Sequence, residues 1–367
     1  MVEVFRRWFL ILFAVLLFWP GLPFGFAEAD NSLRPVSPKL LEHAKLRMLW
    51  YDKVPIKKSE SLDELFIVGE RVYALSDHNY LVCYNRVNGR LIFSKSIAPA
   101  GLPVLGLELY RDKLHSIIGN RLVELNPEFG TELSSKHLEF DVICPAACNS
   151  SFFYLSGRDR SLHALRAEDK VPIFQASAND GSQIISVIAD VNLVVFATDT
   201  GACISMAVDE QEEIWRFSAA GAIVHPIVRD GDELYIASKD TNIYKLNIHT
   251  GNLIWTHQTA GFLDTGPQST KNTIYQHVPR EGLLAVDKAS GKRLWTLAGG
   301  EDLLAERNRL AYVITDGRKL VVMDNKAGRE LYSVNFVGVS RYVSNVGDEK
   351  IYIADEAGRI ACLAPIE

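Results

Sequence analysis

The stretch Glu233–Trp255, ELYIASKDTNIYKLNIHTGNLIW, decides the fold of this chain. It holds three runs in which apolar and polar residues alternate, with turns at Ser238–Asn242 and His249–Gly251, and it ends on a tryptophan. Alternation with a period of two is typical of β-strands rather than helices. Equivalent stretches end on Trp215 and Trp295, at intervals of 40 residues. A fixed period of this size indicates a repeat architecture.

The repeat can be followed along the chain by the position of Trp255, which we call the slot. The slot residues of successive copies lie 37 to 41 residues apart and are Phe93, Ser134, Phe174, Trp215, Trp255, Trp295 and Tyr332. In five copies a glycine stands four residues before the slot, namely Gly89, Gly130, Gly251, Gly291 and Gly328. An asparagine or aspartate stands four residues before each glycine, at Asn85, Asn126, Asn247, Asp287 and Asp324. Asx side chains start turns and glycine takes the positive φ that closes them, so this pattern predicts a tight turn before the slot.

A second turn of the repeat carries an aspartate in six copies, at Asp77, Asp159, Asp199, Asp240, Asp316 and Asp355. Because these carboxylates recur at one turn position, we interpret them as turn residues. The chain also lacks an H-E-x-x-H motif, a phosphate-binding loop and a Ser/His/Asp spacing. The sequence therefore gives no reason to assign a catalytic, cofactor-binding or metal-binding residue.

Each copy predicts a four-stranded antiparallel sheet of about 40 residues, and the all-β fold that stacks such sheets radially is the β-propeller. We expect the slot residue to open the fourth strand and to fill the wedge between neighbouring blades. The last copy, Val343–Pro365, has only three strands, and the missing strand is expected at Leu46–Tyr51, with Trp50 in an eighth slot. An N-terminal strand that completes the C-terminal blade closes the ring. We predict eight blades; seven is the alternative, because the copies with Ser134 and Phe174 are degenerate.

The chain begins with features of a secretory leader, and we expect residues 1–29 to be a signal peptide. Arg6 and Arg7 precede the apolar run Trp8–Trp19, and Ala27-Glu28-Ala29 offers a cleavage pattern. The run is shorter than the roughly 20 residues of a membrane span, although an uncleaved anchor that also uses Leu22–Phe26 is the alternative. An exported protein of the periplasm or cell envelope is the expected consequence.

Residues 30–45 are expected to form a connector, with a short helix after Ser37-Pro38. Residues 46–367 are expected to form a single propeller domain. The first cysteine of the chain is Cys83, so no cysteine near the cleavage region could carry a lipid and we do not expect a lipoprotein. Removal of residues 1–29 takes away two basic and two acidic residues, which leaves the net charge at −6. Without a basic cluster, nucleic acid is not an expected partner.

The five cysteines are an odd number for an exported chain. Cys83 and Cys362 take equivalent third-strand positions in the first and last copies, which become neighbours when the ring closes, and we interpret them as small core residues. Cys144 and Cys148 either form a local disulfide or remain free. Neither spacing resembles a zinc site.

The repeat resembles the PQQ-type propeller repeat, whose consensus ends in D-x-x-T/S-G-x-x-x-W. The segments Asn247–Trp255 and Asp287–Trp295 match this ending, and Asn85–Phe93 and Asp324–Tyr332 match it with other aromatic residues in the last place. The resemblance extends over about residues 46–365. One branch of the family, the quinoprotein dehydrogenases, holds pyrroloquinoline quinone and calcium on the axis of an eight-bladed ring. Another branch, the BamB-like proteins, consists of exported rings of about this length that bind partner proteins.

The chain lacks features that the resemblance to quinoprotein dehydrogenases would require. It has no adjacent cysteine pair, no large insertions, and no tryptophan outside the leader and the slots to stack under a quinone. We therefore predict an exported, monomeric, non-catalytic scaffold that binds protein or peptide partners at the envelope, with no cofactor. We expect membrane association only through an uncleaved leader or a partner. The alternatives are a small oxidoreductase that uses pyrroloquinoline quinone plus calcium, and an extracytoplasmic ligand sensor.

Two sets of positions are candidates for contact with a ligand or partner. In four copies a proline is expected at the start of the innermost strand, namely Pro103, Pro145, Pro226 and Pro267. The residues just before these prolines are expected to line one mouth of the central channel, and they are Leu102, Cys144, His225 and Gly266. His225 with Cys144 could bind a metal or ligand there, and an axial lining without a ligand is the alternative. The exposed candidates are the segments Phe140–Ser150, Ala260–Thr265, Pro127–Phe129 and Glu168–Lys170. The last two depart from the repeat, through either drift or the presence of a partner surface.

Overall fold

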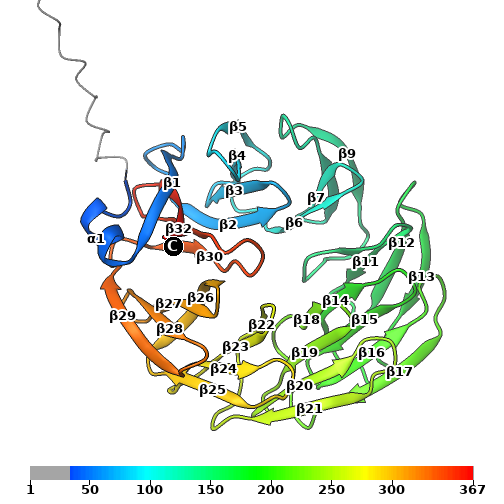
Figure 1. The fold of residues 1–367 in the computed structure, drawn as a ribbon. Helices are drawn as coiled ribbons and strands as arrows, with labels where there is room; N and C mark the ends of the chain where they lie inside the picture. Colours follow the sequence, from blue (N-terminus) through cyan, green and yellow to red (C-terminus); the bar gives the residue numbers. More distant parts are fainter. Residues whose placement is uncertain (1–33, 367) are drawn as a thin grey trace, which may run out of the picture. The chain divides into compact units, whose positions relative to one another are not determined.

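The computed structural model describes residues 34–366, and their strands form eight four-stranded antiparallel sheets arranged around a central axis (Figure 1). This is an all-β, eight-bladed propeller, so the fold prediction is confirmed and the seven-bladed alternative is wrong. The predicted signal peptide lies outside the described residues. No helix within residues 34–366 is long and apolar enough to cross a bilayer.

The first four blades follow one another along the chain, each with its innermost strand first. Blade 1 contains β2 (Leu62–Val68), β3 (Arg71–Ser76), β4 (Tyr80–Asn85) and β5 (Leu91–Ser96). Blade 2 contains β6 (Val104–Tyr110), β7 (Lys113–Ile118), β8 (Arg121–Leu125) and β9 (Glu132–His137). Blade 3 contains β10 (Ala147–Cys148), β11 (Phe152–Ser156), β12 (Leu162–Arg166) and β13 (Pro172–Ala176). Blade 4 contains β14 (Ile184–Ala189), β15 (Val194–Thr198), β16 (Ala202–Met206) and β17 (Glu213–Ser218).

The second half of the ring repeats this order. Blade 5 contains β18 (Val228–Asp230), β19 (Glu233–Ala237), β20 (Asn242–Asn247) and β21 (Leu253–Gln258). Blade 6 contains β22 (Gln268–Ser269), β23 (Thr273–Val278), β24 (Gly282–Asp287) and β25 (Arg293–Leu297). Blade 7 contains β26 (Gly300–Arg307), β27 (Leu310–Thr315), β28 (Lys319–Asp324) and β29 (Arg329–Asn335). Blade 8 contains β30 (Arg341–Val343), β31 (Ile351–Ala354), β32 (Arg359–Pro365) and β1 (Leu46–Lys53).

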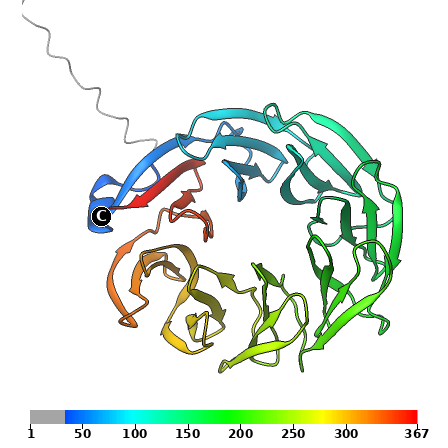
Figure 2. The same ribbon diagram turned by 45° about the vertical axis from the view of Figure 1, so that its right-hand side comes forward.

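Blade 8 joins the two ends of the described chain, and Figures 1 and 2 both show blue β1 beside red β32. The two strands run antiparallel from the Leu46–Pro365 pair to the Lys53–Arg359 pair, and Trp50 lies opposite Cys362. This arrangement confirms the predicted closure by an N-terminal strand. It also places Cys83 of β4 and Cys362 of β32 in neighbouring blades, where both side chains are buried.

The two middle strands of each blade are mostly buried, while the outermost strand is more exposed. In blade 5, Leu234 to Ala237 of β19 and Ile243 to Lys245 of β20 are all buried. Blades pack face to face, so both faces of a middle strand meet a neighbouring sheet. The fourth strand β9 is the extreme case on the outer side, because all of its residues are exposed.

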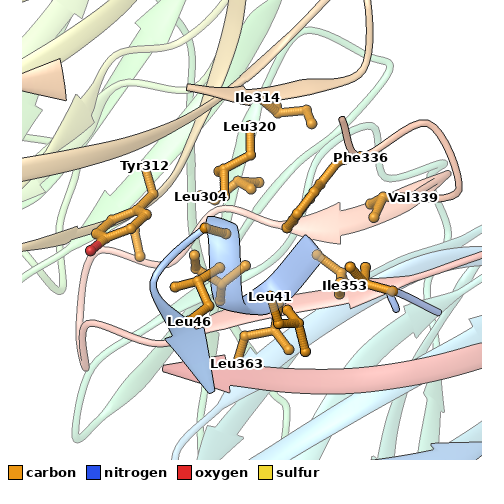
Figure 3. Packing of buried hydrophobic residues seen from close by; sticks show 14 of the residues in the cluster. Leu41, Leu46, Leu304, Tyr312, Ile314, Leu320, Phe336, Val339, Ile353 and Leu363 are labelled. Atoms are coloured by element: carbon orange, nitrogen blue, oxygen red, sulfur yellow. The ribbon is translucent and has the colours of Figure 1, made fainter. Parts of the chain in front are cut away.

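A short helix, α1 (Pro38–His43), packs against blades 7 and 8. Ser37 caps it by accepting a hydrogen bond from the backbone N–H of Leu40, and Pro38 occupies the first turn, as preferred at helix starts. Leu41 of the helix is buried in an apolar cluster with Phe336 of the segment after β29 (Figure 3). The predicted helix is confirmed, and it contributes to the core of the ring.

The turn residues have the roles that the repeat predicts. Asn247 Oδ1 accepts hydrogen bonds from the N–H groups of His249 and Thr250, both at 3.0 Å, and Gly251 follows with φ +69°. The aspartates of the second turn also accept backbone hydrogen bonds. Asp240 Oδ2, for example, binds the N–H of Ala220 just before the first strand of its blade, at 2.9 Å. In blades 1, 4 and 5 the carboxylate therefore ties this turn to the segment that leads into the first strand.

Candidate functional site

We call the contact surface between two neighbouring blades a seam. Aromatic residues in the slots fill these seams. The ring of Trp215 in blade 4 packs on Gly251 of blade 5, where a Cβ would come within 2.6 Å of the ring. Its indole N–H donates to the carbonyl of Ile248 at 2.9 Å. Trp50 makes the same contacts with Gly89 and the carbonyl of Arg86 across the seam that closes the ring. Glycine is thus required both for its positive φ and for its lack of a side chain.

Two expectations about the slot need correction. The slot residue is the third residue of its strand in β21 (Leu253–Gln258), so it does not open the strand. Trp255 also remains partly exposed, whereas Trp215 and Trp295 are buried at 9% and 4% exposure. Trp255 nevertheless keeps the regular contacts, with Gly291 and with the carbonyl of Lys288 at 3.1 Å.

The seam between blades 2 and 3 is built differently. Its slot residue is Ser134, and the position of the glycine is taken by Lys170, which keeps a positive φ of 59°. The ammonium of Lys170 donates to the carbonyl of Ala167 at 2.6 Å. The carbonyl of Ala167 is equivalent to the carbonyl of Ile248, which Trp215 binds in the seam between blades 4 and 5. Serine and lysine therefore take the places of tryptophan and glycine at this seam.

A buried carboxylate holds this substituted seam together. Glu124 of β8 accepts hydrogen bonds from Lys113 and Lys170, each at 2.8 Å, and from the hydroxyl of Ser134 at 2.7 Å. Burial alone would raise the pKa of Glu124, but the two ammonium groups and the hydroxyl bring that pKa well below its usual value. His115 lies 3.2 Å from the same carboxylate, and burial lowers the pKa of its imidazole.

An open groove lies at the surface of this seam, and we call it the seam groove. Two cavities, of about 360 Å³ and about 540 Å³, lie along β9, and Lys136 lines both of them. The smaller cavity lies over the cluster around Glu124, and Ala167–Lys170 line it on the blade 3 side. The larger is lined by Lys136–Phe140 on the blade 2 side and by residues of β12 and β13 on the blade 3 side.

The larger cavity combines apolar and polar groups. Phe140 stacks on the imidazole of His163, with ring centres 3.6 Å apart and planes inclined by 9°. His163 Nε2 lies 2.9 Å from Asp159 Oδ2, so this turn aspartate also orients the imidazole. Phe174, the slot residue of blade 3, lines the same cavity with Pro172. This lining suits a polypeptide with both an apolar and a polar side chain.

Two of the four exposed candidate segments meet at the seam groove. Phe140 begins one segment, and Glu168–Lys170 is the other. The turn Pro127–Phe129 does not reach the groove, because Arg71 of blade 1 binds the carbonyl of Pro127 and the carboxylate of Glu128. The segment Ala260–Thr265 lies at the axis instead, where Thr265 lines a cavity of about 370 Å³.

The axial mouth does not form a metal site from His225 and Cys144. His225 is exposed and lies beside Gly266 of the next blade, while Cys144 is buried in blade 3 on the far side of blade 4. Residues 34–366 contain no group of three His, Cys, Asp or Glu side chains placed to hold a metal. Cys144 and Cys148 are both free, so the local disulfide is not formed. Burial raises the pKa of Cys144 to about 11 and, with Glu108, that of Cys148 to about 12.

Sequence reasoning missed a carboxyl group in the 370 Å³ cavity. Asp302 of β26 lines it with Glu301, Gln268 of β22 and Tyr342 of β30. Burial raises the pKa of Asp302 to about 6. The clue in the sequence is the acidic pair Glu301-Asp302 within an innermost strand, although blade 1 carries the acidic pair Asp63-Glu64 at the same place.

The axial cavities offer few unpaired cations for the carboxylates of pyrroloquinoline quinone. This cofactor is a polycarboxylate, and the 370 Å³ cavity has two carboxyl groups and no lysine or arginine in its lining. A second axial cavity, of about 650 Å³, contains Arg229, Lys271 and Lys288, and Asp190 and Asp230 pair with Arg229 and Lys288. Each tryptophan within residues 34–366 lies in a seam, where it cannot stack on an axial ligand.

Comparison with known proteins places the chain among relatives of the same architecture. A family model described as outer membrane protein assembly factor BamB matches residues 119–295, 200–336 and 280–365. An uncharacterized protein of Rickettsia conorii is 22% identical over 230 residues, which are 57% of this chain. The chain spans 56% of that relative's length.

Three solved structures share the fold. BamB from Moraxella catarrhalis superimposes with a TM-score of 0.67 at 13% identity, covering 87% of this chain and 97% of its own. The computationally designed protein Ika8 gives 0.66 at 13%, with coverages of 84% and 98%. The quinohemoprotein alcohol dehydrogenase ADHIIG from Pseudomonas putida gives 0.62 at 12%, with coverages of 88% and 76%. At these identities the likeness shows the fold alone. Since the family model matches more than half of the chain, the protein belongs to the PQQ-repeat β-propeller family described as outer membrane protein assembly factor BamB.

Proposed function

We propose that this protein is a non-catalytic scaffold of the cell envelope that binds a partner protein in the seam groove. The observation that carries the proposal is the pair of adjoining cavities beside the exposed strand β9, at the seam where Ser134 and Lys170 replace the Trp–Gly seal. Exposed grooves between rigid elements are common docking places for polypeptides. The family description, an assembly factor, supports a role in protein assembly.

The chemistry of the seam groove suits an extended polypeptide segment. Phe140, Phe174 and Pro172 provide apolar and aromatic surface for an anchoring side chain. Lys136, which lies between the two cavities on exposed β9, provides a cation at the rim. Rim charges of this kind guide the partner and set its register more than they add affinity.

The test is a pull-down from envelope extract of the native host with a paired control. The groove variant carries Lys136→Glu and His137→Ala on β9. The control carries Lys95→Glu and Ser96→Ala on β5, the equivalent positions of blade 1, where the slot residue Phe93 seals the seam. We expect the wild type and the control to retain the same partner and the groove variant to lose it. Retention of every partner by the groove variant would contradict the proposal.

A further inference from the structure

The axial cavity beside Asp302 has the composition of a binding site. Its wall comes from three successive blades, with Gln268 on β22, Asp302 on β26 and Tyr342 on β30. These are the innermost strands of blades 6, 7 and 8, so the cavity opens toward the central channel. Its volume of about 370 Å³ lies within the range of small-ligand sites.

The charged groups in the lining are mostly of one sign. Glu301 and Asp302 supply two carboxyl groups, His277 is the one residue able to become cationic, and the lining has no lysine or arginine. The carboxylates of the lining therefore favour a cation over an anion. The guanidinium of Arg318 also acts on Tyr342 from outside the lining.

The hydrogen-bonding groups of the cavity are unevenly satisfied. Asp302 Oδ1 accepts from the side-chain amide of Gln268 and from the backbone N–H of Leu303, the latter at 2.8 Å. The amide oxygen of Gln268 is buried and has no donor in the structure. Buried acceptors without a donor are costly, so this oxygen calls for an N–H or O–H group from outside the chain.

An aromatic wall completes the site. Tyr342 lies on the opposite side of the cavity from β22. Burial raises the pKa of its hydroxyl, and the carboxyl groups of Asp302 and Glu301 raise that pKa further. The phenol therefore stays neutral, and the face of its ring can attract a cation. Acidic groups, an amide acceptor and an aromatic face together select a positively charged donor.

We propose that this axial cavity binds a small organic cation, a protonated amine or guanidinium, through Asp302, Glu301 and the amide oxygen of Gln268. The cation would be either a free molecule or a lysine or arginine side chain presented by a polypeptide, and the recognition chemistry is the same for both. The site lies at the axis and shares no residue with the seam groove, so it does not depend on the proposed scaffold function.

The test is isothermal titration of the purified protein at pH 7.5 with propylguanidinium, and with propylurea as its uncharged isostere. We expect propylguanidinium to bind at least about tenfold more tightly than propylurea, because only the cation gains from the two carboxylates. A Gly-Arg-Gly amide titrated in the same way distinguishes the two sources: binding shows that a polypeptide can reach the site, and its absence assigns the site to free molecules.

Two variants make the test specific. Asp302→Asn keeps the size of the side chain and its acceptor oxygen but removes the charge, and it should weaken propylguanidinium binding at least about tenfold. Glu210→Gln removes one charge from an exposed turn of blade 4 and should leave binding unchanged. No binding of propylguanidinium, equal binding of propylurea, or unchanged binding by the Asp302→Asn variant would overturn the proposal.

Discussion

At the scale of single residues, four seams of the ring are held by a contact between one slot aromatic and one glycine of the next blade. The glycine both adopts a positive φ and leaves room for the ring, and these two requirements can be separated by experiment. Gly251 has φ +69° and lies under Trp215, whereas Gly231 has φ +61° and no atom within 4 Å of the place that a Cβ would take. The two residues form a matched pair.

Gly251→Ala should destabilise the protein more than Gly231→Ala. The left-handed backbone costs about 1–2 kcal/mol in either variant. Overpacking against Trp215 adds about 1–3 kcal/mol in Gly251→Ala alone. Urea unfolding of both variants measures the difference in the free energy of unfolding. Equal losses would show that the ring contact does not require glycine.

A second prediction at this scale concerns pH. Since the pKa of Asp302 is raised to about 6 from an ordinary 3.8, the folded protein holds a proton between roughly pH 4 and 6 that the unfolded chain has released. The stability of the folded state therefore falls as the pH rises through this window. Asp302→Asn removes the cost of the buried charge.

The Asp302→Asn variant should be more stable than the wild type at pH 7.5, by at most about 3 kcal/mol, and should lose this advantage at pH 4. Glu301, His277 and Tyr342 also line the cavity, so the variant is compared with the wild type at each pH to cancel their titration. Thermal unfolding at several pH values gives the result. A difference that does not change with pH would mean that Asp302 is not protonated in the folded state.

At the scale of elements, the seam between blades 2 and 3 shows how one interface can change its chemistry and still join its two blades. Ser134, Lys170 and Glu124 act together, and a tryptophan or a glycine introduced alone fits poorly. Ser134→Trp displaces Lys170 from Glu124, and Lys170→Gly leaves the buried carboxylate with one ammonium fewer. Both changes together recreate the regular seal, with the indole N–H directed at the carbonyl of Ala167.

The two substitutions should therefore be coupled. We expect the double variant to be more stable than the sum of the single variants predicts, by about 1–3 kcal/mol, as is usual for residues that share partners. A double-mutant cycle in urea measures this coupling. Additivity within about 0.5 kcal/mol would mean that Ser134 and Lys170 do not replace the Trp–Gly pair as a unit.

The helix α1 provides a second test at this scale. Leu41 is 5% exposed in the cluster that joins blades 7 and 8, so Leu41→Ala should cost about 2–5 kcal/mol. Lys39→Ala, on the exposed side of the same helix, should cost less than about 0.5 kcal/mol. If Leu41→Ala were as mild as Lys39→Ala, the helix would be dispensable for the ring.

At the scale of the whole molecule, the period of the slot tryptophans predicts the propeller, and the position of Trp50 predicts both the closing strand and the number of blades. The seam groove could not be predicted in this way. Ser134 and Glu168–Lys170 deviate from the pattern like drifted residues, and their compensation is visible only once Lys170 is seen at the carbonyl of Ala167. The role of Asp302 could not be predicted for a related reason. The innermost strands vary between copies, so aligning the repeats says little about them.

The central claim is that a partner protein occupies the seam groove, and site-specific photo-cross-linking in living cells tests it most directly. A photoreactive residue replaces Lys136 in one strain and Lys95, its equivalent in blade 1, in another. We predict one discrete cross-linked protein from position 136 and none from position 95. No adduct from position 136, or the same adduct from both positions, would contradict the account.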